Sequence, residues 1–450
     1  MALYNVLDYG AMPGGEASST AGIQAAIDAA ALAGGGTVFV PAGRYHTGSI
    51  ALRSRVELRL SPGAVLHFGA DPAEYPIVDS RWEGVRRRVH ASCLYGADLE
   101  DVSVTGGGTL DGGGAPWWDR HRGGPEQLPY PRPKLIGLDR CRRVTLRDLN
   151  LRNSPSWTVN PVLCTDVTID NLSILNPADS PNTDGIDPES CSGVRISNCH
   201  IDVGDDCIAI KSGTEETPER VPCENIAISN CTMLHGHGAV VLGSEMSGDI
   251  RNVVIQNCVF KQTDRGLRFK SRRGRGGTVE DVRVSNIVME DVICPFILNL
   301  YYFCGPRGKD RYVWDKNPYP VTEETPRFRR IHFAHITARR VHAAAGFLYG
   351  LAEMRVSEIT FDDVDISMAE DAVAGLPAMM ADLQPMRAQG FFLGNVQDVS
   401  FHRVRLTGHE GPAFRIENGE GVEIEDCRSR GADGSPQQLV VEERPAGANR

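Results

Sequence analysis

The chain has 450 residues, with 47 Lys and Arg against 58 Asp and Glu, a formal net charge of −11 and a pI of about 5.6. This acidic balance argues against nucleic acid as a partner, because polyanions bind proteins through clustered positive charge. Apolar stretches are too short to span a membrane, and the opening residues MALYNVLDYGAMPGG lack the charged start and long apolar core of a secretory signal. We therefore expect no membrane partner, and a cytoplasmic protein unless a leader has been removed.

The first predicted element is a short amphipathic helix over Ser19–Leu32 (STAGIQAAIDAAAL), within a cap of about residues 18–35. A side chain of the Ser18-Ser19-Thr20 run is placed to cap its start, and the glycines after Ala33 end it. Because the terminal coil of a solenoid needs a cover, we expect this helix to close the first coil.

Short apolar units of the form Val/Ile-x-apolar then recur along the chain. They begin at Val102, Val144, Val167, Val194, Ile226, Val253, Val282, Ile331, Ile359, Val399 and Val422. From Val144 to Val282 the steps are 23, 27, 32, 27 and 29 residues. Alternation at this period predicts a parallel β-helix with one coil per repeat and insertions confined to loops. We expect a single domain over residues 1–430 and a polar, poorly ordered tail over 431–450.

Two columns accompany these units. Four residues after the start of a unit stand asparagines, namely Asn171, Asn198, Asn230, Asn257 and Asn286. We expect each to adopt a left-handed turn and to bond its neighbour in the next coil. One residue later stand Leu149, Leu172, Cys199, Cys231, Cys258 and Ile287. Because the cysteines share a column with leucine and isoleucine, we expect buried free thiols rather than disulfides or metal ligands.

Two long insertions interrupt the repeat, and both carry aromatic residues. The first excursion, residues 112–134, contains Trp117, Trp118 and Tyr130, and the second, residues 303–326, follows Tyr301 and Tyr302. Long loops in a regular solenoid are commonly functional. Two interpretations stay open, since these rings could lie exposed to stack on sugars or could pack the loop onto the solenoid.

Four segments between residues 181 and 271 align on a terminal serine. They are PNTDGIDPES, VGDDCIAIKS, GHGAVVLGS and DRGLRFKS, ending at Ser190, Ser212, Ser244 and Ser271. Four residues before each serine stand the apolar residues Ile186, Ile208, Val240 and Leu267. If the segments are neighbouring parallel strands, equivalent residues lie about 4.8 Å apart. One surface patch would then hold Asp184, Asp205, Asp206, His237, Arg268 and Lys270.

This patch suits acid–base chemistry. The three aspartates could bind calcium, but the nearby cations Arg268 and Lys270 would offset their charge, so we expect no metal and no cofactor. Like charges at close range raise the pKa of one carboxyl, and a paired acid and base is what glycoside hydrolysis requires. Strict alternation would point Asp184 and Asp206 inward, so the strands are expected to begin after them.

The segments Asn182-Thr183-Asp184, Asp205-Asp206, Gly236-His237-Gly238 and Arg268-Phe269-Lys270 resemble, in order, the four motifs of the polygalacturonases, glycoside hydrolase family 28. The family usually has isoleucine where Phe269 stands, and the resemblance covers roughly residues 5 to 430. It implies an all-β, single-stranded right-handed parallel β-helix of the pectin-lyase type. It also implies hydrolysis of the α-1,4-galacturonosyl linkages of galacturonan with inversion.

The resemblance also implies a role for each motif residue. Asp205 would be the general acid, Asp184 and Asp206 would hold and deprotonate the attacking water, and His237 would orient or tune the acid. Asn182, Arg268 and Lys270 would bind substrate, the two cations through its carboxylate. Lys211 shares the column of Lys270, so it is either a second substrate-binding cation or a solvated lysine.

Three alternatives remain at this point: a rhamnogalacturonan hydrolase on the same fold, a calcium-dependent polysaccharide lyase, and a β-helix that only binds sugar, such as an adhesin or tail spike. Three aspartates in register favour the hydrolases, and the Arg268–Lys270 pair favours uniform galacturonan. Because either excursion could wall off one side of a cleft, we expect attack from a chain end, releasing monogalacturonate.

Overall fold

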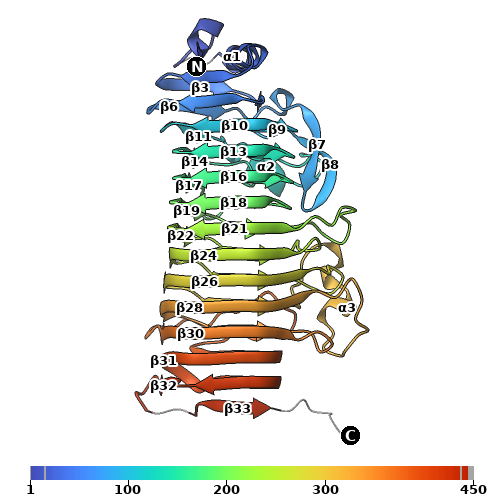
Figure 1. Ribbon diagram of the computed structural model, residues 1–450, viewed down its shortest axis with the longest axis vertical. Coiled ribbons are helices and arrows are strands. Elements are labelled where there is room, and N and C mark those ends of the chain that lie inside the picture. Colours follow the sequence, from blue (N-terminus) through green and yellow to red (C-terminus); the bar gives the residue numbers. More distant parts are fainter. Residues whose placement is uncertain (1, 15–16, 436–437, 444–450) are drawn as a thin grey trace. The chain divides into compact units, whose positions relative to one another are not determined.

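The computed structural model describes residues 2–14, 17–435 and 438–443. The chain divides into two compact units, Met1–Ala209 with Cys223–Cys231, and Ile210–Pro222 with Thr232–Arg450. Within each unit, parallel strands recur coil after coil, and the fold is the right-handed parallel β-helix that the sequence predicts (Figure 1). Each unit is described by itself, and the single domain over residues 1–430 stays a prediction.

The N-terminal helix α1 (Thr20–Leu32) covers the first coils, as predicted. Its buried face consists of Ile23, Ala26, Ile27 and Ala30, and it packs against β1 (Leu3–Asn5), β2 (Gly36–Val40), β4 (Ile50–Ala51) and β5 (Val56–Leu60). Ser19 occupies the N-cap position without a side-chain cap, because its hydroxyl is engaged by the backbone of Met12, whose N–H donates to Ser19 Oγ at 3.1 Å. Of the three residues predicted as candidates for the cap, Ser18 accepts through its Oγ from the N–H of Thr20, the first helical residue, at 3.4 Å. A one-turn 3₁₀ helix, η1 (Val6–Tyr9), precedes α1.

In the first unit the repeated apolar units stack in register. Val102, Val144, Val167, Val194 and Ile226 pair successively across β10 (Glu100–Thr105), β13 (Arg142–Arg147), β16 (Thr165–Asp170), β18 (Ser192–Ser197) and β21 (Cys223–Ser229). The other strands of these coils are β3 (Gly43–Thr47), β6 (Ala64–Phe68), β9 (Leu94–Ala97), β11 (Thr109–Asp111), β12 (Ile136–Asp139), β14 (Asn150–Arg152), β15 (Val159–Val162), β17 (Ser173–Leu175), β19 (His200–Val203) and β20 (Ile208–Ile210). The predicted coil period is confirmed here.

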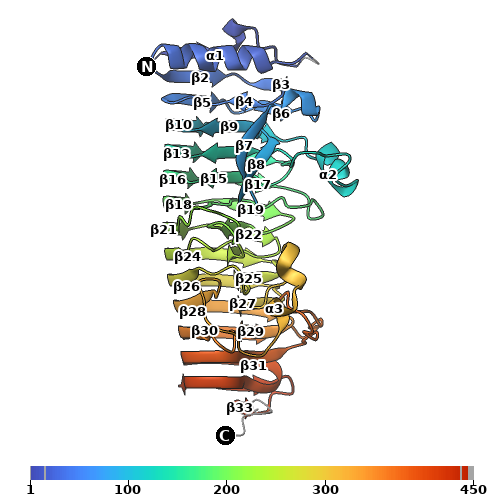
Figure 2. The same ribbon diagram turned by 90° about the vertical axis from the view of Figure 1, so that its right-hand side faces the viewer.

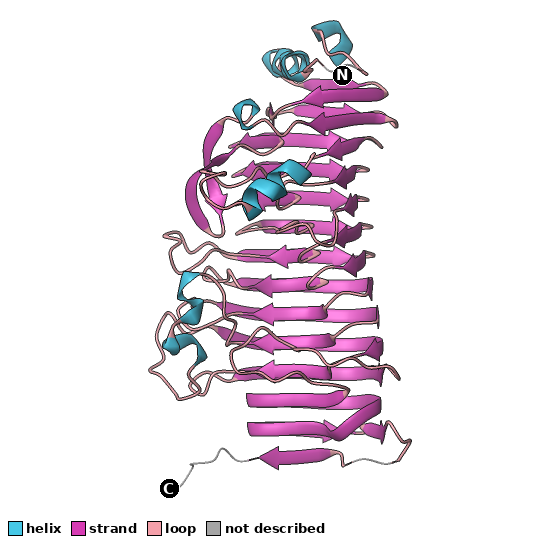
Figure 3. Cartoon of the chain, turned by 180° about the vertical axis from the view of Figure 1, so that it is seen from behind, coloured by secondary structure: helices cyan, strands magenta, loops and turns pink. Residues whose placement is uncertain are grey.

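The second unit repeats the pattern with longer strands (Figure 3). Val253, Val282, Ile331, Ile359 and Val399 pair successively across β24 (Ile250–Lys261), β26 (Thr278–Glu290), β28 (Arg327–Val341), β30 (Val356–Met368) and β31 (Gln389–Glu425). The remaining elements are β22 (Thr232–His235), β23 (Val240–Gly243), β25 (Arg265–Lys270), β27 (Cys294–Asn299), η3 (Pro306–Lys309), α3 (Arg311–Trp314), β29 (Ala344–Tyr349) and β32 (Arg428–Gly431). Stacked phenylalanines fill its interior, and the rings of Phe361 and Phe401 lie 4.8 Å apart.

The asparagine column adopts the left-handed turns that the sequence predicts. Asn198 and Asn230 both have φ of 57°, and Asn230 donates to Asn198 Oδ1 at 3.4 Å. In the second unit Asn286 donates to Asn257 Oδ1 at 2.7 Å. The cysteine column, Cys199, Cys231 and Cys258, is buried at 1–2% exposure like the leucines and isoleucine that share it.

Two features on one side of the first unit depart from the coil (Figure 2). One is an antiparallel hairpin, β7 (Ile77–Trp82) and β8 (Val85–His90), which the periodicity did not predict; a short 3₁₀ turn, η2 (Pro72–Glu74), precedes it. The other is helix α2 (Ala115–Arg122) in the first excursion. Its Trp117 and Trp118 are 0% and 8% exposed, so these two rings pack the loop onto the solenoid and are not open to sugar.

Part of the C-terminal tail is ordered. Strand β33 (Val440–Glu443) pairs with β31, Phe414 facing Val440 and Arg415 facing Val441, so the prediction of a poorly ordered tail over 431–450 is wrong for this strand. Residues 436–437 and 444–450 lie outside the described part of the chain. Among the described residues, the helices are all too short or too polar to cross a membrane.

Candidate active site

The three aspartates of the first unit lie on the bends that enter their strands. Ile186 bridges Ile208 in parallel register, and the Gly185 N–H donates to the Asp206 carbonyl at 3.0 Å. A Cβ at Gly185 would lie 2.4 Å from the Cys207 carbonyl oxygen, so only glycine allows the two bends to approach so closely. The predicted register is confirmed. Strand β20 begins at Ile208, after Asp205 and Asp206 as predicted, whereas Ile186 and Glu189 after Asp184 form isolated bridges in place of the predicted strand.

Asp184, Asp205 and Asp206 converge on one point. Each offers a carboxylate oxygen, and these three atoms lie within 4.8 Å of one another. Asp184 and Asp206 are 3% and 2% exposed, whereas Asp205 is more open. Carboxylates this close can supply both the acid and the base of one reaction. The same three oxygens are also the group that could hold a divalent cation.

The backbone around Asp184 is fixed by hydrogen bonds within the first unit. Its carbonyl accepts from the Thr158 N–H at 2.9 Å. The buried amide of Asn176 donates to Thr158 Oγ1 at 2.8 Å and to the Thr183 carbonyl at 3.3 Å. Asn182, predicted to bind substrate, is half-buried on the preceding turn. The backbone that carries the Asp184 carboxylate is therefore held in one position.

The predicted cations lie together in the second unit. Val240 and Gly243 of β23 pair with Leu267 and Lys270 of β25, as the serine alignment predicts. Arg268 and Lys270 are 4% and 8% exposed. The ring centroid of Tyr302 lies 5.6 Å from the Arg268 guanidinium carbon and 5.3 Å from Lys270 Nζ. Tyr302 therefore joins this pair through cation–π contacts, a role that its position just before an irregular loop did not reveal.

Lys211 is a buried lysine and not the solvated one that remained an alternative. It is 6% exposed, and the residue after it, Ser212, donates its N–H to the Glu245 carbonyl at 2.7 Å. Burial alone would raise the pKa of Glu245, but the charges of Lys211, Arg275 and Lys270 outweigh burial and hold that pKa below its usual value. Glu245 thus ties Lys211 electrostatically to Lys270, and its importance was not visible in the sequence motifs.

The remaining arginines of residues 268–275 (RFKSRRGR) form ion pairs and hydrogen bonds within the second unit. Arg272 donates to Glu215 Oε1 at 2.6 Å and Arg275 lies 3.1 Å from the other oxygen of that carboxylate. Arg273 donates to Glu353 Oε1 at 2.6 Å and to carbonyls of the second excursion, including that of Tyr312 at 3.0 Å. These three arginines are therefore engaged within the second unit, whereas Arg268 and Lys270 remain the cations predicted to bind an acidic substrate.

His237 lies on the segment before β23, with an exposed side chain between two buried glycines. The neighbouring backbone is anchored to the segment before β25, because Asp264 N–H donates to the Gly236 carbonyl at 2.9 Å and Ala239 N–H to the Arg265 carbonyl at 3.0 Å. An exposed imidazole on an anchored backbone can meet a ligand or a carboxyl from a fixed position.

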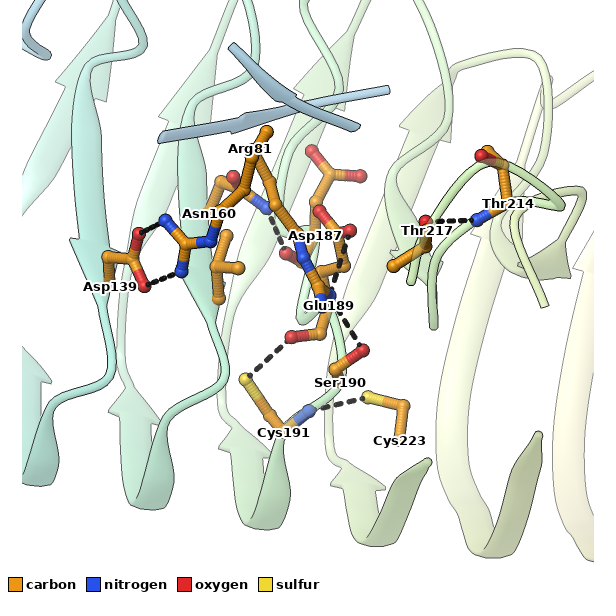
Figure 4. Close-up of polar contacts among 12 residues, drawn as sticks. Arg81, Asp139, Asn160, Asp187, Glu189, Ser190, Cys191, Thr214, Thr217 and Cys223 are labelled. Atoms are coloured by element: carbon orange, nitrogen blue, oxygen red, sulfur yellow. Dashed lines mark hydrogen bonds and ion pairs between the residues drawn. The ribbon is translucent and has the colours of Figure 1, made fainter. Parts of the chain in front are cut away.

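The hairpin of the first unit also reaches the serine column (Figure 4). Arg81, 2% exposed, donates to Ser190 Oγ at 2.9 Å and lies 3.4 Å from Glu189 Oε1. Lys134 donates to the Arg81 carbonyl at 2.8 Å. Ser190, one of the four aligned serines, therefore has a structural partner in this coil.

A third excursion, residues 369–388, lies between β30 and β31 and was not recognised in the sequence. Arg265 donates to the Leu376 carbonyl at 2.7 Å and to the Pro377 carbonyl at 3.3 Å. Asn299 donates to the Met379 carbonyl at 3.2 Å. Tyr302, which contacts Arg268 and Lys270 and lies at the edge of the second excursion, also forms a β-bridge with Met380 of the third excursion. Both excursions of the second unit therefore lie beside its cation pair.

Comparisons with known proteins agree with this geometry. The model of the family described as glycosyl hydrolases family 28 matches residues 38–376, and one described as rhamnogalacturonase A/epimerase, pectate lyase-like matches residues 3–60. A probable polygalacturonase of Vitis vinifera is 34% identical over 380 residues, which are 82% of this chain and 75% of the relative. The crystal structure of a hyperthermoactive exopolygalacturonase from Thermotoga maritima superposes with a TM-score of 0.73 at 31% identity, covering 83% of this chain and 89% of that one. A family 28 exopolygalacturonase of Yersinia enterocolitica, with a TM-score of 0.76 at 21% identity over 94% of this chain and 78% of its own, is alike in fold.

Proposed function

The chain belongs to family 28 of the glycosyl hydrolases, and from this premise we propose that it hydrolyses the α-1,4-galacturonosyl linkages of galacturonan. The observation that carries the proposal is the convergence of three carboxylate oxygens within 4.8 Å, on a chain that also holds the buried pair Arg268 and Lys270. Carboxylates supply the acid and base of glycoside hydrolysis, and an arginine fork binds a sugar carboxylate bidentately.

In this proposal Asp205 is the general acid, because it is the most open of the three and can reach a glycosidic oxygen. It protonates the leaving oxygen while Asp184 and Asp206, both buried, hold a water and remove its proton as it attacks the anomeric carbon. Arg268 and Lys270 bind the galacturonate carboxylate, with Asn182 as a further substrate contact. His237 tunes the acid, and Lys211, whose charge helps to hold the pKa of Glu245 low, is a further cation of the second unit.

Inversion at the anomeric carbon is part of the proposal and has its own test. The three closest oxygens, within 4.8 Å, are nearer than the roughly 6.5–9.5 Å between the carboxyl groups of most inverting enzymes. Two carboxylates that share one water can accept this shorter spacing, because neither then acts as nucleophile. NMR of the first product formed distinguishes the outcomes, since the β-anomer supports inversion and the α-anomer contradicts it.

We propose exo attack releasing monogalacturonate. Support comes from the similarity to the Thermotoga maritima exopolygalacturonase and from the two excursions beside the cation pair of the second unit, which could close one end of a cleft there. Of the aromatics in the second excursion, Trp314 is 38% exposed and so open to a terminal ring.

The deciding experiment is a time course on polygalacturonate and on trigalacturonate, with products separated by length. Steady release of monomer at nearly constant viscosity is expected, and an early fall in viscosity with mixed oligomers would contradict exo attack. Rhamnogalacturonan serves as the control backbone. Ultraviolet absorbance of an unsaturated uronate would indicate a lyase and overturn hydrolysis itself.

A further inference from the structure

Arg132, at the end of the first excursion, is buried against the turn that leads to Asp184. It is 1% exposed. Its Nη1 donates to the carbonyls of Pro155 at 3.0 Å and Pro181 at 2.7 Å, and its Nη2 donates to Asn182 Oδ1 at 2.7 Å. A buried guanidinium is stable only where its donors find acceptors. Two of these three hydrogen bonds therefore hold the segment that carries Asp184, one of the proposed catalytic carboxylates.

The contact with Asn182 fixes both a backbone turn and an amide. Asn182 has φ of 53°, a left-handed conformation that needs support from its surroundings. Because its Oδ1 accepts from Arg132, the group that its side chain can offer a sugar is the Nδ2 donor. This donor suits a hydroxyl or carboxylate oxygen of galacturonate, so Arg132 determines what Asn182 presents to substrate.

Arg132 also places a positive charge beside Asp184. Burial lowers the pKa of the Arg132 guanidinium to about 10, against the opposing attraction of Asp184 and Glu83, so it stays protonated at neutral pH. The charged and titratable groups that act on these two residues within the first unit are Glu83, His121, Arg122, Asp205 and Asp206. A cation beside a carboxylate favours its ionised form.

We propose that Arg132 is a positioning residue for the reaction, which holds the Asn182 amide and the Asp184 turn in their working geometry and favours Asp184 as the ionised base. This inference rests on the proposed function. The simpler alternative is that Arg132 only anchors the first excursion to the solenoid, in which case its charge and the Asn182 contact are incidental to catalysis.

Arg122 provides a matched control. It belongs to the same excursion and donates to the Asp179 carbonyl at 3.0 Å, on the same segment that continues to Asp184. Its side chain is 49% exposed. Arg122→Gln therefore removes one excursion-to-turn contact of a similar kind without touching Asn182.

The experiment compares R132Q, R132K and R122Q on polygalacturonate, with kcat and KM measured across the acid limb of the pH–rate profile. We expect R132Q to lose about 100-fold in kcat, as small misplacements of catalytic groups do. Its acid limb should move up by about one pH unit, since one nearby charge is lost. Because lysine keeps the positive charge, the acid limb of R132K should lie at the same pH as that of the wild type. Its kcat should lie between those of R132Q and the wild type. R122Q should match the wild type in kcat, and its acid limb should move much less than that of R132Q because solvent screens the half-exposed Arg122 charge.

The proposal would be overturned if R132K and R132Q lost the same factor in kcat and the acid limb of neither variant moved. A kcat of R132Q within a few-fold of that of R122Q would also overturn it. If R132Q does not fold, N182A and R132K are combined in a double-mutant cycle. If the two substitutions change kcat less in combination than the sum of their separate effects, in free energy, Arg132 acts through Asn182. Additive changes overturn that role. A wild type inactive on galacturonan defeats the proposed function instead. Amide exchange over residues 181–185 then decides the positioning role, because only faster exchange in R132K than in R122Q supports it.

Discussion

Arg268 donates a hydrogen bond from Nη2 to the sulfur of Met379 at 3.3 Å. The two residues are 111 positions apart, and the contact brings the third excursion onto one of the two predicted substrate cations. Thioether sulfur is a weak acceptor, so a sugar carboxylate can displace it from the guanidinium at little cost. Met379 therefore holds Arg268 in place through a contact that the predicted substrate carboxylate could replace.

Asp205→Asn should lower kcat by about 10²–10⁴-fold, because it removes the general acid while leaving the apolar columns intact. Rates on polygalacturonate and the far-ultraviolet circular dichroism of the variant are measured together. Asp179→Asn is the control, since Asp179 is an exposed carboxylate of the same unit. A variant that keeps more than about a tenth of the wild-type kcat would remove Asp205 from the acid role.

Arg268→Ala and Lys270→Ala should raise KM and lower kcat/KM, by about 2–4 kcal/mol in the transition-state free energy for the more buried Arg268. Added salt should also weaken substrate binding by the wild type. Steady-state kinetics at two ionic strengths measure both effects. Lys261→Ala, which removes an exposed lysine of β24 in the same unit, should leave kcat/KM unchanged. Two cation variants with wild-type kcat/KM would show that the carboxylate is bound elsewhere.

Asp111→Asn should destabilise the protein at neutral pH by about 2 kcal/mol. Burial would raise the pKa of Asp111, but His67, Asn153 and Arg152 together hold it well below the usual value. A depressed carboxyl pKa contributes stability above about pH 4, and this stability is lost as the pH falls through the folded pKa. Denaturant unfolding of both proteins at several pH values is the measurement. The difference in the free energy of unfolding between the wild type and Asp111→Asn should narrow below about pH 4. A difference that stays constant with pH contradicts this account.

Thiol labelling should separate the cysteines by burial. Cys304 and Cys427 are partly accessible, whereas the other ten, including Cys199, Cys231 and Cys258, are buried. We expect an alkylating reagent to modify at most these two in the native protein and all twelve after denaturation without reductant. Mass spectrometry of the peptides gives the number and the positions of the alkylated cysteines. Bridges among Cys199, Cys231 and Cys258 would contradict the buried-thiol interpretation.

The coil register was predictable because a parallel strand repeats one apolar position per turn. Val144 and Val167 pair as their alignment requires, and so do Ile186 and Ile208. The asparagine turns followed from the left-handed conformation that this side chain tolerates. The carboxylate cluster followed from the same register, since one alignment places Asp184 beside Asp206.

The excursions were not predictable, because they follow no period. Trp117 gives the same sequence signal whether it is exposed or fully buried, and only the packing against Tyr75, with ring centroids 5.2 Å apart, decides it. The hairpin over 77–90 pairs locally and antiparallel, so a search for coil-length repeats passes over it. Tyr302 and Arg132 reach their partners through tertiary contacts that no motif spacing encodes.

The hydrogen bond from Gly185 N–H to the Asp206 carbonyl has a consequence for how such an enzyme can be redesigned. The spacing of the Asp184 and Asp206 backbones is set there by main-chain atoms of adjacent coils. Excursions are inserted at the turns, where length changes leave the coil intact. Transplanting the second or third excursion from a relative, which leaves Arg132 in place, should therefore change the length of oligosaccharide accepted while the bond-breaking step keeps its rate, so selectivity and chemistry can evolve separately on this scaffold.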